Sequence, residues 1–271
     1  MSISDLILHR RSVRTFREAP LAPETAMRLL SYAVRAGNPY GIPVGFRLLD
    51  AKEHGLSSAV IVGERTWIAG KVRRVPHAEE AFGYTFENVL LQALSMGAGS
   101  CWMAGTMNRS AFEKAMDLGA DEVMPCVSPL GEPAEKMSLR EAMMRRAIRA
   151  DERLPFGELF FDGDFGRPRT ADAARPLDRI LELVRRAPSA VNRQPWRAVV
   201  GDGCVHFFER RSKGYTDGTG WDLQKVDAGI ALSHFAAGLK AEGIEGRLDL
   251  NDPGLSLPEN TEYIATYLLN L

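Results

Sequence analysis

The chain has 271 residues, of which 45% are hydrophobic and 25% are charged. This composition is ordinary for a folded globular protein and excludes a disordered chain, a collagen and a coiled-coil rod. The formal net charge is −1, so the chain has no overall field that would hold nucleic acid or an anionic membrane. We therefore expect neither as a partner, and any positive site has to be local. The length corresponds to one large domain or two small ones.

Cysteine usage and the N-terminus indicate a cytoplasmic protein. The three cysteines form no CxxC pair, and an odd number is a poor disulfide framework, so we expect a reducing compartment. Residues 1–8 are too short for a signal peptide. Residues 88–108 carry no charge and are long enough to cross a bilayer. Because this stretch contains Gln92, Ser95, Gly97 and Gly99, we predict a buried helix followed by a glycine-rich turn.

The first half of the chain is predicted to mix helices and strands. Ser4 and Asp5 can cap a first helix that runs through Arg11, and Pro23 suits the first turn of a second. The further predicted elements, in chain order, are a helix over 24–35, strands over 46–49 and 58–62, a long apolar helix over 79–96, a short helix over 110–116, a strand over 123–127 that ends before Pro129 and Gly131, and a basic amphipathic helix over 138–148.

The second half is predicted to repeat this order. It contains a helix over 176–186, strands over 196–200 and 205–209 joined by a hairpin turn, a long apolar helix over 222–242 and a strand over 263–269. The order helix, breaker, two strands, long helix, glycine turn and strand thus occurs twice, which favours an internal duplication. The alternative is an unduplicated α+β chain whose elements alternate in the same way.

Several classes of catalytic site are excluded by missing motifs. The sequence has no GxxxxGK[ST], no HExxH and no GxSxG, so we expect no P-loop, no zinc site of that kind and no hydrolase nucleophile. Its five histidines are scattered without ligand spacing, and we expect no metal.

The first segment that could carry chemistry is His9–Phe16, HRRSVRTF. Arg10, Arg11, Ser12 and Arg14 form a compact set of donors for a phosphate or another planar anion. The alternative is a solvated helix end, where basic residues are common.

The second segment is 186–196, RAPSAVNRQPW. Between Pro188 and Pro195 the chain displays a hydroxyl and two side-chain amides, which together offer hydrogen-bond donors and acceptors to the edge of a heterocycle. An ordinary turn, in which these side chains serve as local caps, is an equal interpretation.

Taken together, these segments resemble the FMN-dependent nitroreductase family. RRSVRTF resembles the opening of that family and APSAVNRQPW its second flavin motif. LQALSMGAGSCWMAG, residues 91–105, is similar to a third motif, and SPLGEPAE, residues 128–135, to the segment after the central strand. The first-half segment GNPYGIP lacks the second motif, and the second half has only GRPR in place of RRSVR. This arrangement resembles the fused, internally duplicated branch, the TM nitroreductase type.

The resemblance implies an α+β, nitroreductase-like fold with two tandem repeats. These would form an intramolecular pseudo-dimer in which helices flank an antiparallel or mixed sheet, so that the chain can exist as a monomer. Residues 1–160 would form the half with RRSVR and the GAGSCWMAG turn, and residues 161–271 the half with APSAVNRQPW. Together they would make one flavin-binding unit, because the degenerate segments lack the donors for a second site.

The resemblance also implies roles for individual residues. The phosphate and pyrimidine side of FMN would contact Arg10, Arg11, Ser12 and Arg14, and the ring edge would be lined by Pro188, Ser189, Ala190, Asn192 and Gln194. Backbone would come close to N5 and O4 at Ala104 and Gly105. The phosphate would also be reached, from the segment after the sheet, by Arg149 and Arg153. Glu132 stands where the family prefers an aromatic residue.

The function implied is that of an FMN-dependent oxidoreductase. Hydride from NADH or NADPH would pass to flavin N5 and then to a nitroaromatic, a quinone or a similar small electron-poor acceptor. No side chain need act as acid or base, because the flavin carries the chemistry. Two alternatives stay open: a flavin-binding sensor or carrier without turnover, and the same fold used for other flavin chemistry. Cys101 lies in the glycine turn, where we expect a buried structural thiol.

Overall fold

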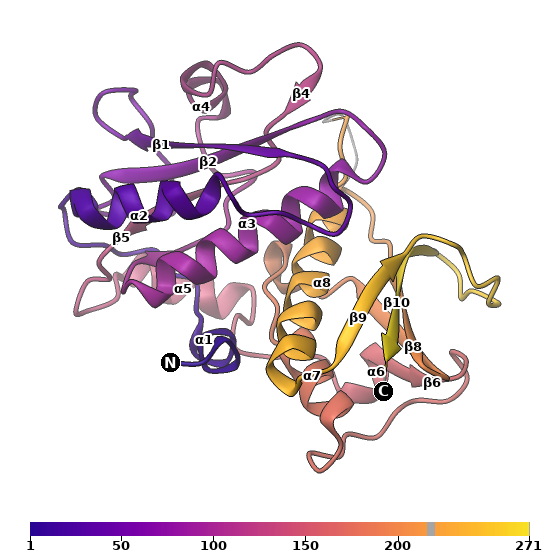
Figure 1. Ribbon diagram of the computed structural model, residues 1–271. Coiled ribbons are helices and arrows are strands. Elements are labelled where there is room, and N and C mark those ends of the chain that lie inside the picture. Colours follow the sequence, from indigo (N-terminus) through magenta and orange to yellow (C-terminus); the bar gives the residue numbers. More distant parts are fainter. Residues whose placement is uncertain (216–219, 271) are drawn as a thin grey trace. The chain divides into compact units, whose positions relative to one another are not determined.

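The computed structural model describes residues 1–215 and 220–270. The chain forms two compact units (Figure 1). Unit 1 consists of Met1 and His9–Asp151, and unit 2 consists of Ser2–Leu8 and the chain from Glu152 onward. Helix α1, Ile3–His9, therefore belongs almost entirely to unit 2 although it comes first in the sequence. The assignment of flavin-binding roles to the halves 1–160 and 161–271 stays a prediction.

Unit 1 is built on an antiparallel sheet with the strand order β1-β2-β5-β3, to which β4 adds a short pairing with β2. Its elements are α2 Pro23–Ala33, β1 Val44–Asp50, β2 Thr66–Arg73, α3 Ala78–Ser95, β3 Gly99–Ser100, α4 Arg109–Ala115, β4 Glu122–Val123, β5 Val127–Gly131 and α5 Leu139–Ala147.

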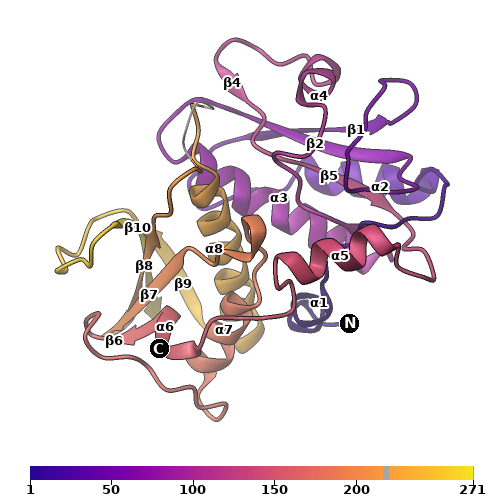
Figure 2. The same ribbon diagram turned by 180° about the vertical axis from the view of Figure 1, so that it is seen from behind.

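Unit 2 is built on a mixed sheet with the order β6-β7-β8-β10-β9, in which β6 pairs parallel to β7 and the other neighbours are antiparallel (Figure 2). Its further elements are α6 Phe156–Leu159, β6 Phe160–Asp162, α7 Pro176–Arg185, the 3-10 turn η1 Ala190–Asn192, β7 Trp196–Gly201, β8 Cys204–Arg210, α8 Leu223–Glu242, β9 Glu245–Asp249 and β10 Thr261–Asn270.

The two sheets share one pairing order. In unit 1 a hairpin, β1-β2, is followed by α3, then β3, then β5, which pairs with both β2 and β3. In unit 2 the hairpin β7-β8 is followed by α8, then β9, then β10, which pairs with both β8 and β9. The predicted α+β fold with antiparallel and mixed sheets is confirmed, and the shared order supports an internal duplication.

The long helices are buried because their apolar residues surround the helix instead of following one stripe. In α3 both Phe82 and Phe86 are fully buried, and in α8 so is Phe235, which packs edge-on against Phe207 of β8 with ring centroids 5.0 Å apart. A helix that is apolar all round belongs in a core. This confirms the prediction of a buried helix. Within 1–215 and 220–270, no helix has the length and apolarity needed to cross a membrane.

The predicted strands need correction in three places. No strand covers 58–62, where the chain makes only isolated bridges from Ser58 and Val62, and the strand that pairs with β1 is instead β2, residues 66–73. The strand expected over 123–127 is two short strands, and the second of them, β5, continues through Pro129 to Gly131. Strands β3, β6 and β9 were not predicted. Among the helices, α1 ends at His9 and does not reach Arg11.

Candidate functional site

The segment His9–Phe16 in unit 1 is extended after α1 and fixed by backbone hydrogen bonds. Val13 N donates to Ser100 O over 2.9 Å, and Phe16 N donates to Val62 O over 2.8 Å. Arg14 N donates to the carboxylate of Glu141 in α5 over 3.1 Å. The arginines of this segment are therefore presented from a backbone that is held on both sides, which is the preorganisation a binding site needs.

Arg10 and Arg14 are buried, whereas Arg11 is exposed. Only 6% of the Arg10 side chain is accessible, and its Nε lies 3.9 Å from Oε1 of Glu87. Within the described residues, Arg10 Nε and Arg14 Nη1 are buried without a hydrogen-bond partner. Burying a guanidinium nitrogen without a hydrogen bond costs free energy, so the interpretation as a solvated helix end fits the exposed Arg11 but not Arg10 and Arg14. Arg10 and Arg14 are suited to an anion.

Ser12 lies beside the glycine turn through a parallel bridge to Ser100 and a side-chain hydrogen bond with the Cys101 thiol. Burial raises the pKa of the Cys101 thiol, although Arg14 lowers it in part. A thiol with a raised pKa is a poor nucleophile. This agrees with the predicted structural role of Cys101.

The glycine turn is held by Arg109, a residue that no sequence motif had marked. Its guanidinium donates to Ala104 O over 2.8 Å and to Met124 O over 2.6 Å. Gly105 is exposed, and a Cβ placed there would meet no described atom within 4 Å. At Gly99, by contrast, a Cβ would lie 2.9 Å from Val13 Cγ2. Packing therefore requires glycine at 99, while the backbone at 105 is open to a ligand.

In unit 2, residues 188–195 form a strained loop between α7 and β7. Val191, Asn192 and Gln194 have φ values of 41°, 60° and 51°. The left-handed region is rarely adopted by non-glycine residues, and for the β-branched Val191 it costs about 1–3 kcal/mol. Strain of this kind persists only where surrounding contacts impose it, and it is common at ligand sites.

Several hydrogen bonds hold this loop. Ser189 Oγ accepts from Gln194 N over 2.8 Å, and Gln194 Oε1 accepts from Leu154 N over 3.0 Å. Ala190 N donates to the buried carboxylate of Asp227 in α8, with oxygens at 3.0 and 3.2 Å. Ser189 and Gln194 therefore hold the loop to itself and to Leu154. The backbone of Ala190 is held by Asp227, which the sequence interpretation missed.

Asn192 connects the loop to Arg153. Arg153 Nη1 donates to Asn192 Oδ1 over 3.4 Å, and Asn192 Nδ2 donates to Glu152 O over 3.0 Å. Arg149, the other candidate from this part of the chain, lies in unit 1, is exposed and has φ 49° directly after α5. The structure thus brings Arg153 into contact with a predicted flavin residue of its own unit.

The carboxylates that support these segments were also missed, because no motif marks them. Glu141 accepts from Arg14 and Thr15, Glu87 faces Arg10 and accepts from Trp102 Nε1 over 2.8 Å, and Asp227 accepts from Ala190. Their one signal in the sequence is an acid within an otherwise apolar helix, as at Glu87 and Asp227.

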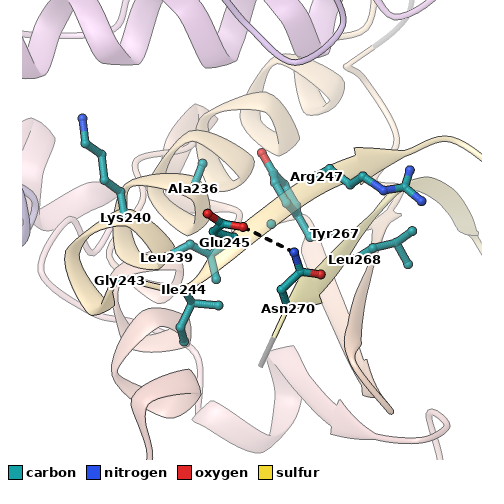
Figure 3. Close-up of a pocket in the computed structure, with 11 residues that line it drawn as sticks. Ala236, Leu239, Lys240, Gly243, Ile244, Glu245, Arg247, Tyr267, Leu268 and Asn270 are labelled. Atoms are coloured by element: carbon teal, nitrogen blue, oxygen red, sulfur yellow. Dashed lines mark hydrogen bonds between the residues drawn. The ribbon is translucent and has the colours of Figure 1, made fainter.

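A separate hollow of about 640 Å³ lies in unit 2 between the end of α8 and strands β9 and β10 (Figure 3). Lys240, Glu245 and Arg247 are among its lining residues, and Asn270 Nδ2 donates to Glu245 Oε2 across it over 3.4 Å. The predicted flavin residues do not line it.

A protein-family model described as "Putative TM nitroreductase" matches residues 2–239. The chain belongs to this nitroreductase family, as its sequence motifs predict. The solved structure of a putative nitroreductase from Thermotoga maritima is similar over 99% of this chain and 93% of that one, with a TM-score of 0.62 and 19% identity. That likeness confirms the fold.

Two other structures are similar to about half of the chain. An FMN-dependent nitroreductase from Clostridium difficile covers 49% of this chain and 88% of its own, at 17% identity and a TM-score of 0.41. A putative NADH dehydrogenase/NAD(P)H nitroreductase from Bacteroides thetaiotaomicron covers 50% and 89%, at 23% identity and a TM-score of 0.43. No curated protein matches the sequence.

Proposed function

We propose that the protein is an FMN-dependent oxidoreductase that takes hydride from NADH or NADPH and passes it to a nitroaromatic, a quinone or a similar electron-poor acceptor. Family membership supports the class of flavin oxidoreductase. The observation that carries the cofactor assignment is a pair of buried guanidinium nitrogens, Arg10 Nε and Arg14 Nη1, that have no hydrogen-bond partner among residues 1–215 and 220–270. Both sit on a segment whose backbone is held by hydrogen bonds within the chain, and both would gain charge-assisted hydrogen bonds from a phosphate or from the pyrimidine carbonyls of FMN.

Each unit offers groups that FMN needs. In unit 1, Arg10 and Arg14 would supply donors for its anionic side. In unit 2, Asn192 would supply an amide for the ring edge, from a loop whose strain marks it as held in one conformation. Gly105 leaves its backbone uncovered for a close approach. When bound, the flavin would supply hydride transfer, while the protein binds it, orients it and excludes water.

The experiment that tests this function has two parts. Purified protein is incubated with FMN, desalted and examined for flavin absorbance, and bound protein is then assayed for NADH or NADPH oxidation with and without a quinone. Retained flavin together with quinone-dependent oxidation supports the proposal. Retained flavin without turnover would make the protein a flavin carrier or sensor, and loss of all flavin on desalting would overturn the cofactor assignment.

A further inference from the structure

Asp227 is a buried carboxylate in the first turns of α8, beneath the loop 188–195. It is 3% exposed, and its two oxygens lie 3.0 and 3.2 Å from the backbone nitrogen of Ala190, 37 residues earlier in the chain. This contact ties the loop to the long core helix of unit 2. The bonds of Ser189 and Gln194, by contrast, tie the loop to itself and to Leu154.

The loop needs such a tie. Val191, the residue after Ala190, has φ 41° and ψ 32°, and it is 54% exposed. An exposed β-branched side chain gains little from burial, so it does not stabilise this backbone conformation itself. Contacts on either side of Val191 have to do so, and one of them is the hydrogen bond from Ala190 N to the buried side chain of Asp227.

Other charged groups surround Asp227. Glu209 of β8 and Asp222 at the start of α8 both act on it electrostatically. Arg211 lies 3.9 Å from both Glu209 Oε1 and Asp222 Oδ2, and Arg211 and Lys225 also pair with Glu262 of β10. Three acids, Glu209, Asp222 and Glu262, thus share two bases. Burial, followed by the charges of Glu209 and Asp222, raises the pKa of Asp227 well above its ordinary value.

We propose that Asp227 is the positioning residue of the loop 188–195 and that it acts by accepting the hydrogen bond of Ala190 N–H. An ionised carboxylate accepts such a hydrogen bond more strongly than a neutral acid does, and the hydrogen bond from Ala190 accordingly opposes the rise in pKa that burial causes at Asp227.

This inference rests on the proposed function only for its ligand readout, because the contact between Asp227 and Ala190 lies within the chain. The first measurement is amide hydrogen exchange at Ala190 in the flavin-free protein, divided by the intrinsic rate at each pH. Asp227→Ala removes the acceptor, and Asp227→Asn keeps an amide oxygen but cannot ionise. Ser233→Ala, a change of a buried side chain further along α8, is the matched control.

We expect Asp227→Ala to speed exchange at Ala190 by about 5- to 150-fold, the fold-change for the loss of one buried hydrogen bond. Asp227→Asn keeps an acceptor oxygen and should stay within about threefold of wild type. Ser233→Ala should not differ from wild type. Unchanged exchange in Asp227→Ala would overturn the positioning role, and so would an equal increase in Ser233→Ala.

The second measurement is FMN affinity in the same variants. It should be weakened in Asp227→Ala and preserved in Asp227→Asn at pH 6. If wild type binds no FMN while the exchange results hold, the proposed function fails and the positioning role stands. If wild type binds FMN and Asp227→Ala binds it equally well, the positioning role fails and the proposed function stands.

Discussion

The guanidinium of Arg10 lies 3.9 Å from the carboxylate of Glu87, and both side chains are buried. Glu87 also accepts a hydrogen bond from Trp102. Removing Arg10 alone would therefore leave a buried carboxylate without its cation, which typically costs about 3–5 kcal/mol of stability. In that variant, weaker flavin binding would result both from reduced stability and from a lost contact with the flavin. The role of Arg10 therefore has to be tested in a background where Glu87 is replaced by a neutral residue.

The first prediction uses Glu87→Gln as that background. Adding Arg10→Gln should weaken FMN binding about 10- to 150-fold, because one charged hydrogen bond to the phosphate is worth about 1.5–3 kcal/mol. Riboflavin, which has no phosphate, should lose less than about threefold. Fluorescence titrations with both ligands measure the difference. Equal losses would show that Arg10 does not contact the phosphate.

The second prediction concerns the ring-edge loop. Asn192→Ala removes the contacts of Asn192 with Arg153 and with the carbonyl of Glu152. It should also weaken FMN binding about 5- to 150-fold through the loss of the hydrogen bond that we propose between Asn192 and the flavin ring. Val191→Ala is the control, because that neighbouring side chain is mostly exposed. If the FMN affinity of Asn192→Ala equals that of Val191→Ala, Asn192 does not belong to the site.

The third prediction separates glycines required by packing from those required by a ligand. Gly99→Ala should destabilise the protein, because its Cβ would lie 2.9 Å from Val13 Cγ2 and 3.0 Å from Pro133 Cγ; overpacking of this kind costs about 1–3 kcal/mol. Gly105→Ala should leave the melting temperature of the flavin-free protein unchanged and weaken FMN binding. Thermal melts and titrations of the two variants test this, and unaltered FMN binding in Gly105→Ala would remove the turn from the site.

The fourth prediction concerns Glu209, which is fully buried and whose pKa is raised to about 8 by burial and by Asp222 and Glu262. Since the folded state holds this proton more tightly than the unfolded state, stability is lost as pH rises from the unfolded pKa of about 4.5 toward 8. The loss between pH 5 and pH 8 is roughly 3 kcal/mol.

Glu209→Gln should therefore stabilise the flavin-free protein at pH 8 more than at pH 5, as measured by urea unfolding at both values. Glu242→Gln is the control. Its carboxylate pairs with Arg179, which lowers the pKa of Glu242, so its effect should be the same at pH 5 and pH 8. A stability difference for Glu209→Gln that does not change with pH would contradict the prediction.

The sequence predicted the helices well, because their signals are local. Pro23 and Pro176 stand in the first turns of α2 and α7, and Asp222 caps α8 by accepting from Gln224 N. The failures lie in the strands. Residues 58–62 are apolar and β-branched as a strand should be, yet they make only isolated bridges. Pairing across the sheet, which a local pattern does not contain, decides strands.

Strand β2 is the opposite case, a strand that the sequence did not predict. It is buried on both faces, so it lacks the alternation of a half-buried strand. It also contains Gly70, which depresses strand propensity. That glycine is required because a Cβ would lie 2.9 Å from both Phe46 and Phe82.

In the candidate site, the motifs predicted Arg10, Arg14 and Asn192, but the carboxylates beside them come from distant helices. Glu141 lies 127 residues from Arg14, and no local pattern joins the two.

The last prediction is that each chain binds one FMN. In the segments that would form a second site, the side chains of Asn38 and Arg169 are already engaged by the chain itself. Asn38 of GNPYGIP donates to Ile42 O over 2.7 Å and to Thr85 over 3.0 Å, and its Oδ1 accepts from Tyr40 N over 3.1 Å. Arg169 of GRPR is 9% exposed and paired with Asp178 at 2.6 Å and with Asp162. Freeing Arg169 for a phosphate would leave two carboxylates unpaired, whereas Arg10 Nε and Arg14 Nη1 are buried donors without partners among the described residues. Flavin released by acid from saturated, desalted protein, counted against protein by amino-acid analysis, should give a ratio near one. A ratio of two would show that the second pair of segments also binds flavin.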